Sequence, residues 1–259
     1  MENGLTKIVL VMEYDGTDYF GFQLQANRPE QPTIQSELEK AIYKLTGEAI
    51  RVLAASRTDT GVHAKEQVVS FRTKSKLPAN TFMSGLNHYL PVDIAVKSAH
   101  EVDDSFNVRS DAVSREYRYY IMNRAVRPAV KRQYAFHVPQ PLDVAAMDKA
   151  SRHLVGEHDF AAFTGTLGSR IKTVRRVSRA EVKREGDMVV YDMTAGSFLP
   201  HQIRNTVGAL IQVGSGRMKI EDFYAMMKAK KPASAGPRVP ARGLFLMKVN
   251  YSRPFGEEN

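Results

Sequence analysis

Stretches with the pattern of a β-strand alternate with amphipathic helical stretches along the whole chain, and this alternation most constrains its fold. Residues 7–14 are β-branched and apolar on both faces, which predicts a buried strand. Side chains in residues 113–121 alternate with a period of two, which predicts a strand with one buried face. The pattern predicts further strands at residues 50–54, 67–73, 94–102, 174–183, 189–195 and 244–251.

The stretches between these strands predict helices with one apolar face. In residues 33–46, apolar side chains recur every three or four positions from Ile34 to Leu45. Thr33 is placed to cap the N-terminus of this helix, and Gly47 is placed to end it. The pattern also predicts helices at residues 80–89, 143–154, 200–213 and 220–228, and a connecting segment at residues 123–142.

Both halves of the chain repeat the order strand, helix, strand and contain antiparallel hairpins, one of which turns at residues 185–187. This order predicts an α/β (α+β) fold with two similar subdomains, an N-terminal one over residues 1–110 and a C-terminal one over residues 111–259. A chain of 259 residues is long enough to bury one large core or two modest ones.

The composition excludes several kinds of chemistry. The chain has no cysteine, which excludes disulfides, thiol nucleophiles and thiolate metal sites. The sequence contains no G-x-G-x-x-G or Walker-type loop, so we expect no cofactor. The apolar run Ile8–Met12 has five residues, against the ~20 that a membrane helix needs, and no leader pattern opens the chain. We therefore expect a cytoplasmic protein without a membrane partner.

Positive charge is concentrated in the second part of the chain. Lys and Arg number 37 against 28 Asp and Glu, a formal net charge of +9. Residues 1–110 contain 12 basic and 14 acidic side chains, and residues 111–259 contain 25 and 14, so their net charges are −2 and +11. Such an excess favours binding to a polyanion such as nucleic acid, although a basic solvated surface without a partner has the same composition.

A polar loop at residues 56–63 connects two of the expected strands and contains Asp59. Backbone N–H groups of such a turn can keep a carboxylate ionised and aim it into a cleft. An aspartate in a turn also binds its own backbone two residues on, with no role beyond the turn. The residue pattern alone leaves both interpretations of Asp59 open.

The histidines near acidic residues do not form a recognised metal motif. His153, Glu157 and His158 lack the spacing of a zinc-binding helix, and Gly156 interrupts the helix between them. His63 ends the polar loop and has no second ligand near it in the sequence. We expect structural roles for these histidines and no bound metal.

The loop at residues 55–64 reads ASRTDTGVHA, and it is one of several distinctive segments that occur in a fixed order along the chain. The others are residues 14–23, 33–39, 86–87, 90–91, 115–119, 156–160, 198–205 and 240–244. Together these segments resemble the TruA family of tRNA pseudouridine synthases over residues 7–251, nearly the whole chain. Departures from the family pattern at Phe22, Ser56, residues 106–109 and Pro200 remove no catalytic group.

The resemblance implies a role for each of five residues. Asp59 corresponds to the catalytic aspartate, which attacks or deprotonates during the isomerisation of uridine. Tyr117 corresponds to the tyrosine that stacks on the target uracil and takes part in proton transfer, and Arg204 to the arginine that pairs with the aspartate. Arg57 corresponds to the arginine that takes the place of the flipped base, and Leu244 to an apolar residue beside the uracil.

These residue types suit the chemistry, although each also has a structural interpretation. The reaction exchanges a C–N for a C–C glycosidic bond and is redox-neutral, so it needs an ionised carboxylate but no cofactor, and a nearby arginine opposes protonation of that carboxylate. Flipping the base out of its stack costs about a few kcal/mol, of which an aromatic side chain recovers ~1–3 kcal/mol. By position alone, Tyr117 is equally typical of a core, and Leu244 is most often a core residue. Arg204 is also typical of a surface or phosphate-binding residue.

The resemblance further implies the pseudouridine synthase fold, with a central mixed, mostly antiparallel sheet flanked by helices and a cleft between two subdomains. It implies a homodimer that modifies uridines 38, 39 and 40 in the anticodon stem–loop of tRNA. A catalytically silent RNA-binding protein and an RNA methyltransferase are the alternatives. Binding alone needs neither Asp59 nor its partners, and a methyltransferase normally has a glycine-rich cofactor loop.

In a protein that holds RNA, we expect the basic residues Lys172, Arg175, Arg176 and Arg179 to contact phosphates. They are equally compatible with a solvated strand face.

Overall fold

The computed structural model describes residues 4–25, 27–28, 30–165, 171–253 and 255, and the chain divides into two units. Unit 1 comprises residues 1–113 and 246–259, and unit 2 comprises residues 114–245. Residues 246–259, which the division expected from the sequence assigns to the C-terminal subdomain, therefore belong with the N-terminal residues.

The sheet of unit 1 is built around the apolar strand expected at the start of the chain. Its strands are β1 (Thr6–Tyr14), β2 (Leu53–Ala54), β3 (His63–Thr73), β4 (Ile94–Val102) and β10 (Leu244–Tyr251), which enters unit 1 at residue 246. The order is β4-β1-β3-β10, with β2 on β3. β1 is antiparallel to both neighbours, so Leu10 lies opposite Val69 and Ala99 and is fully buried.

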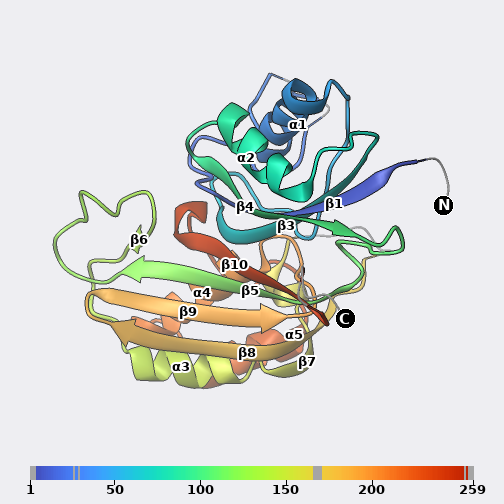
Figure 1. Cartoon of the computed structure of the whole chain (residues 1–259). Coiled ribbons are helices and arrows are strands. Elements are labelled where there is room, and N and C mark those ends of the chain that lie inside the picture. Colours follow the sequence, from blue (N-terminus) through green and yellow to red (C-terminus); the bar gives the residue numbers. More distant parts are fainter. Residues whose placement is uncertain (1–3, 26, 29, 166–170, 254, 256–259) are drawn as a thin grey trace. The chain divides into compact units, whose positions relative to one another are not determined.

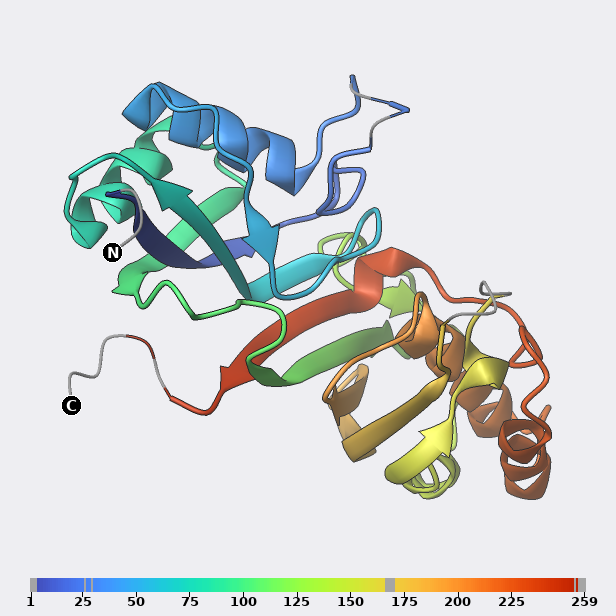
Figure 2. The same cartoon turned by 90° about the vertical axis from the view of Figure 1, so that its right-hand side faces the viewer.

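Two helices, α1 (Ile34–Thr46) and α2 (Ala79–Tyr89), lie side by side over one face of the unit 1 sheet (Figures 1 and 2). The expected start and end of α1 are confirmed. The Thr33 hydroxyl accepts from the Ser36 N–H at 3.1 Å, and the Ser36 hydroxyl accepts from the Thr33 N–H at 3.0 Å. Gly47 ends the helix with φ 76°, a conformation that favours glycine.

The sheet of unit 2 has the order β5-β9-β8-β7, with antiparallel neighbours, and the short β6 lies parallel on β5. Tyr119 and Tyr191 lie opposite each other on β5 and β9, and both are fully buried. Gly186 adopts φ 60° in the expected turn between β8 and β9. The strands are β5 (Ala112–Met122), β6 (Phe136–His137), β7 (Gly156–Asp159), β8 (Val174–Glu185) and β9 (Met188–Ala195).

Three helices of unit 2 pack against one another on one side of its sheet (Figure 1). They are α3 (Val144–Arg152), α4 (Gln202–Gly214) and α5 (Ile220–Ala229), with the short 3₁₀ turns η1 (Ala161–Phe163) and η2 (Ala241–Gly243) beside them. α3 lies against β8, and α4 contacts both α3 and η1. The helices cover the sheet face that carries Tyr119 and Tyr191, so this face forms the core of the unit.

The structure departs from the expected elements chiefly at β2, β3 and β7, and the short β6 lies in the segment expected to be a connection. Residues 50–52 are not part of the strand expected at residues 50–54, because only Leu53 and Ala54 pair with β3. β3 begins at His63, four residues earlier than expected, so the connection between β2 and β3 is four residues shorter. β7 was not expected, because its sequence GEHD has neither an apolar run nor a regular alternation.

The expected α/β fold, with a mostly antiparallel sheet flanked by helices, is confirmed. Within the described part of the chain, none of the helices combines the length and the apolar composition needed to span a bilayer.

Candidate active site

Asp59 lies in unit 1, on the loop between β2 and β3, and it is half-buried. Backbone hydrogen bonds fix the loop on both sides of this residue. The Thr58 carbonyl accepts from the Phe22 N–H at 3.1 Å, and the Asp59 carbonyl accepts from the Val62 N–H at 3.1 Å. The loop therefore closes as a turn at residues 59–62 and is tied to the segment that precedes α1.

A buried polar network holds the loop from the sheet side. Gln67 on β3 is fully buried, and its Nε2 donates to the Ser56 carbonyl at 2.7 Å and to the Tyr14 hydroxyl at 3.3 Å. Its Oε1 accepts from the Ser56 N–H at 3.3 Å. The Tyr14 hydroxyl also lies 2.8 Å from the hydroxyl of the buried Thr58. Positions 56 and 58 are thus fixed by side chains of β1 and β3, which leaves the loop little freedom to move.

Two glycines allow the segment before α1 to approach the loop closely. A Cβ at Gly16 would lie 2.1 Å from the Val62 carbonyl oxygen. A Cβ at Gly21, where φ is +84°, would lie 2.7 Å from the Thr58 carbonyl oxygen. A side chain at either position would displace the loop.

His63 begins β3 directly after the loop and is buried. Its Nδ1 lies 3.1 Å from the backbone nitrogen of Gly16 and 2.9 Å from Oδ1 of Asp15. Nδ1 therefore lies within hydrogen-bond distance of both Asp15 and Gly16 in the turn after β1. His63 therefore has the structural role expected from the sequence, because it ties β3 to the turn after β1.

Arg57 is exposed and precedes Asp59 by two residues. Arg109, from the segment between β4 and β5, lies near it. Burial lowers the pKa of the Arg109 guanidinium, and the positive charge of Arg57 lowers that pKa further. Two guanidinium groups are therefore held near each other beside the loop.

Tyr117 lies on β5 in unit 2 and is only 6% exposed. Its ring meets the half-buried ring of Phe198 edge to face, with centroids 5.1 Å apart and an interplanar angle of 80°. Phe198 precedes α4, and the Arg115 guanidinium donates to the nearby Gly196 carbonyl at 2.6 Å. The segment before α4 is therefore packed against β5, with Phe198 limiting the motion of the tyrosine ring.

Arg204 lies in the first turn of α4 and is half-buried. Its Nε donates to the Val239 carbonyl at 2.9 Å, which fixes the guanidinium beside the segment leading to η2. The next residue of that segment, Pro240, accepts a hydrogen bond from the Tyr119 hydroxyl at 2.7 Å. Burial raises the pKa of the Tyr119 hydroxyl, while the charges of Arg204 and Arg242 act to lower it.

Leu244 is buried and begins β10 directly after η2. A Cβ at the preceding Gly243 would lie 2.8 Å from Cζ of Tyr119, so the chain passes close to β5 here. Within unit 2, the segment 239–244 thus contacts both Arg204 and the β5 strand that carries Tyr117. Asp59 and Arg57 belong to unit 1, and the pairing of Arg204 with Asp59 stays a prediction.

The basic residues at the start of β8 differ in their surroundings. Lys172 and Arg176 are exposed, whereas Arg175 is half-buried. The NH1 group of Arg175 donates to the carbonyls of Lys172 at 2.8 Å and Val174 at 2.7 Å, and burial lowers the pKa of its guanidinium. Lys172 and Arg176 are therefore the more accessible candidates for phosphate contacts.

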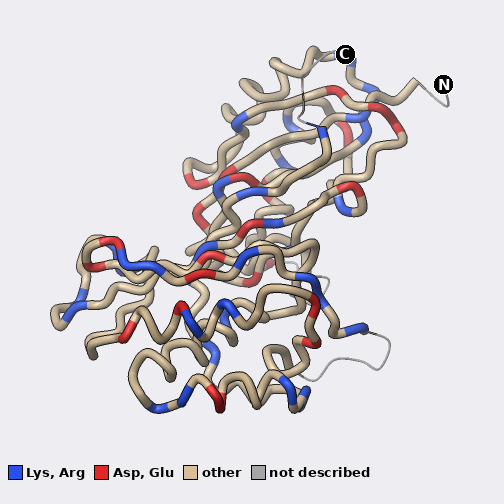
Figure 3. The backbone as a smooth tube through the Cα atoms, turned by 90° about the horizontal axis from the view of Figure 1, so that it is seen from below, with Lys and Arg blue, Asp and Glu red and all other residues tan. Residues whose placement is uncertain are grey.

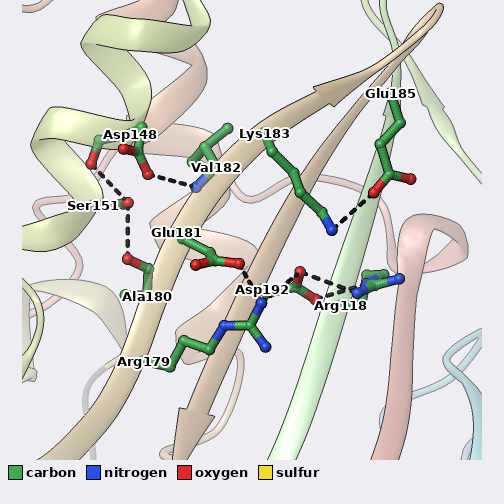
Figure 4. Close-up of polar contacts among 10 residues, drawn as sticks. All are labelled: Arg118, Asp148, Ser151, Arg179, Ala180, Glu181, Val182, Lys183, Glu185 and Asp192. Atoms are coloured by element: carbon green, nitrogen blue, oxygen red, sulfur yellow. Dashed lines mark hydrogen bonds and ion pairs between the residues drawn. The ribbon is translucent and has the colours of Figure 1, made fainter.

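Arg179 belongs to a charged network on the sheet face opposite the core of unit 2 (Figure 4). It forms an ion pair with Glu181 and lies 3.7 Å from Asp192, which also accepts from Arg118 at 2.7 and 3.1 Å. Figure 3 shows Lys and Arg interspersed with Asp and Glu along the chain. Carboxylates therefore neutralise part of the positive charge at Arg179.

His153 and His158 each contact neighbouring groups of unit 2. His153 packs against the ring of Tyr224 with centroids 5.2 Å apart, and His158 Nε2 lies 3.0 Å from the Val155 carbonyl. Among the residues that the structure describes, no group of three or more His, Cys, Asp or Glu side chains is arranged to hold a metal ion.

Sequence reasoning did not identify the residues that support the loop. The sequence did contain an indication that Gln67 has a special role, because it is a polar residue at the start of an otherwise apolar strand pattern. Tyr14 and Thr58 had no such indication, since their contact joins residues 44 positions apart. Phe198 had none either, because it contacts Tyr117 across 81 positions of the sequence.

One known protein family matches parts of both units. The sequence profile of a family described as tRNA pseudouridine synthase matches residues 10–111 and 150–252. The first matched segment contains Arg57 and Asp59, the second contains Arg204 and Leu244, and Tyr117 lies between the two.

Individual relatives match nearly the whole chain. A protein named tRNA pseudouridine synthase A from Thermoanaerobacter sp. (strain X514) is 40% identical over 247 residues, which cover 95% of this chain and 100% of that protein. Proteins of the same name from Pelobacter propionicus and Moorella thermoacetica are 41% and 42% identical. The matches cover 94% and 93% of this chain and 99% and 98% of those proteins.

Proposed function

We propose, from the premise that this chain belongs to the tRNA pseudouridine synthase family, that it converts uridines 38, 39 and 40 of the tRNA anticodon stem–loop to pseudouridine. As a member of this family it is an isomerase that acts on uridine in tRNA. Relatives named tRNA pseudouridine synthase A that match 95% of the chain carry the proposal. The choice of positions 38 to 40 is supported by the resemblance of residues 55–64 to the catalytic loop of the TruA family.

The reaction breaks the bond between N1 of uracil and C1′ of ribose, turns the base, and forms a bond between C5 and C1′. The proton on C5 is released and N1 takes up a proton, so neither a redox partner nor a group donor is consumed. An aspartate that attacks the sugar or the ring, or removes the C5 proton, must be ionised. We assign this role to Asp59, whose loop is held by the Gln67 network.

The other assigned residues prepare the base and the carboxylate. Tyr117 stacks on the flipped uracil, and Leu244 packs beside it. Arg204, fixed through its Nε to Val239, pairs with the carboxylate of Asp59 and opposes its protonation. Arg57 occupies the position that the flipped base leaves. Stacking on an aromatic ring offsets ~1–3 kcal/mol of the cost of flipping.

The assembly and the RNA contacts complete the proposal. The protein acts in the cytoplasm as a homodimer without a cofactor, and Lys172, Arg175, Arg176 and Arg179 contact tRNA phosphates. Light scattering distinguishes the dimer from the 29.0 kDa monomer. A monomer at working concentrations would contradict this part of the proposal alone.

Tritium release from tRNA that carries [5-³H]uridine tests the reaction. Transcripts with a single labelled uridine at position 38, 39 or 40 should each release tritium with the unaltered protein, and a transcript labelled only elsewhere should not. Asp59→Asn should lower release to background, while Asp18→Asn, an exposed carboxylate of the turn after β1, should retain activity. Absence of release from all three positions would overturn the proposal, and activity of Asp59→Asn would overturn the role of Asp59.

A further inference from the structure

A pocket of about 410 Å³ opens in unit 1 beside the Asp59 loop. Its wall includes Phe22 and Gln23 before α1, and Arg51 and Leu53 at β2. Arg57 from the loop and Arg109 from the segment before β5 complete the positively charged part of the wall. All of these residues lie in unit 1, so the pocket is formed within that unit.

Arginine is strongly concentrated at this pocket. Residues 1–110 contain five arginines and carry a net charge of −2, yet three of the five line the pocket. The lining residues that the structure describes include no Asp or Glu. Arg51 also forms an exposed pair with Glu39 at 3.3 Å, outside the pocket wall. Like charges gathered in one place repel, and a bound anion removes that repulsion.

Arg57 and Arg109 both line the pocket, and each guanidinium lies within the electrostatic influence of the other. Burial lowers the pKa of Arg109, and the charge of Arg57 adds to this effect. Paired guanidinium groups match the geometry of a phosphate, which accepts several hydrogen bonds at once. The charged part of the pocket therefore suits a phosphodiester group.

The rest of the wall suits a nucleoside. The half-buried Leu24 and the exposed Leu53 supply apolar surface for a base or ribose, and the exposed Gln23 supplies an amide that can donate to and accept from a base edge. A volume of about 410 Å³ lies within the range of roughly 300–1,000 Å³ typical of small-molecule sites. Phosphate recognition and nucleoside recognition thus occur in one pocket.

The pocket lies beside the candidate reaction centre, because Arg57 lines its wall. Arg57 precedes Asp59 by two residues, so their Cα atoms are at most about 7 Å apart. Successive nucleotides of a helical strand rise about 3.4 Å. We propose that this pocket binds the nucleotide next to the target uridine in the RNA strand, with Arg109, beside Arg57, holding its phosphate. The inference rests on the proposed function, and it adds a contact to a neighbouring nucleotide that the proposed function does not include.

A charge placed at the pocket rim tests the inference. Leu53 is 57% exposed, so Leu53→Glu introduces a carboxylate without burying it, and Leu53→Gln has the same size without the charge. Val92→Glu adds the same charge at an exposed turn between α2 and β4, outside the pocket wall. For a full-length tRNA transcript at 0.15 M salt, we expect Leu53→Glu to raise Kd roughly tenfold over Leu53→Gln. Val92→Glu should bind as the unaltered protein does.

A second variant tests the phosphate contact directly. Arg109→Gln should raise KM more than it lowers kcat, and should reduce the slope of log Kd against log salt by about one. Equal Kd values for Leu53→Glu and Leu53→Gln would overturn the inference, as would an unchanged salt slope in Arg109→Gln. These outcomes differ from failure of the proposed function, in which the unaltered protein releases no tritium whatever its affinity for tRNA.

Discussion

Replacing Gln67 by leucine should separate the rigidity of the Asp59 loop from the stability of the sheet. The change keeps the size of a fully buried side chain but removes both the NH₂ group and the carbonyl oxygen of its amide. Nε2 then no longer donates to the Ser56 carbonyl at 2.7 Å, and Oε1 no longer accepts from the N–H groups of Ser56 at 3.3 Å and Val68 at 3.2 Å.

The expected loss of stability follows from the backbone groups that lose their hydrogen-bond partners. Each backbone group that loses its partner in a buried site costs about 1–3 kcal/mol. Because Ser56 is half-buried, water can replace part of what its two groups lose. We therefore expect the free energy of unfolding to fall by about 2–4 kcal/mol for Gln67→Leu, measured by urea unfolding at pH 7.5.

The same variant should also lose activity. Asp59 lies one residue beyond Thr58, and a displacement of about 1 Å in a reacting group can cost roughly 100-fold in rate. At saturating tRNA, we expect kcat for tritium release to fall roughly 10- to 100-fold, with KM changed far less.

Thr73→Val provides the matched control. Thr73 is buried at the far end of β3, where its hydroxyl donates to Glu48 at 2.5 Å. This variant should lose about 1–2 kcal/mol of stability and keep its kcat. The reasoning is refuted if Gln67→Leu keeps both its stability and its kcat, or if Thr73→Val loses kcat to the same extent.

Two further predictions concern stability. Burial lowers the pKa of His100, so the unfolded chain binds a proton near pH 6.5 more readily than the folded chain, and the free energy of unfolding should fall as pH decreases from 7.5 to 5.0. His100→Gln should show a smaller fall in urea unfolding over that range, and an equal fall would contradict the assignment. Gly16→Ala places a Cβ 2.1 Å from the Val62 carbonyl oxygen, whereas Gly47→Ala meets open space at φ 76°. Gly16→Ala should therefore cost about 2 kcal/mol or more against about 1 kcal/mol for Gly47→Ala, and thermal or urea unfolding that reverses this order would refute the packing argument.

Local elements of this fold were predictable from the sequence because their signals are local. The Thr33 cap, the apolar stripe of α1 and the Gly47 terminator lie within 15 consecutive residues, and the helix begins and ends where they indicate. β10 spans residues 244–251 as predicted. β7 escaped prediction because an edge strand of four residues needs only the hydrogen bonds of β8, and its own side chains alternate little in burial.

In the candidate site, too, the local features were predictable from the sequence and the long-range contacts were not. The Asp59 loop could be identified from a continuous sequence motif, but its supports could not. Tyr14 and Thr58 are 44 positions apart, and Gln67 reaches both the loop and β1 only because the strands pair in register. The pocket beside the loop joins residues 22–25, 35, 51–54, 57 and 109, which no sequence periodicity relates.

The return of β10 to the first sheet sets the order in which the chain can be completed during synthesis. Unit 2 is continuous, from residue 114 to 245, whereas unit 1 needs residues 246–251 to add β10 beside β3. A ribosome therefore delivers every residue of unit 2 before it delivers the last strand of unit 1. Unit 1, whose N-terminal residues emerge first, is therefore completed last. Until residues 246–251 emerge, the edge of β3 that β10 will occupy lacks that strand.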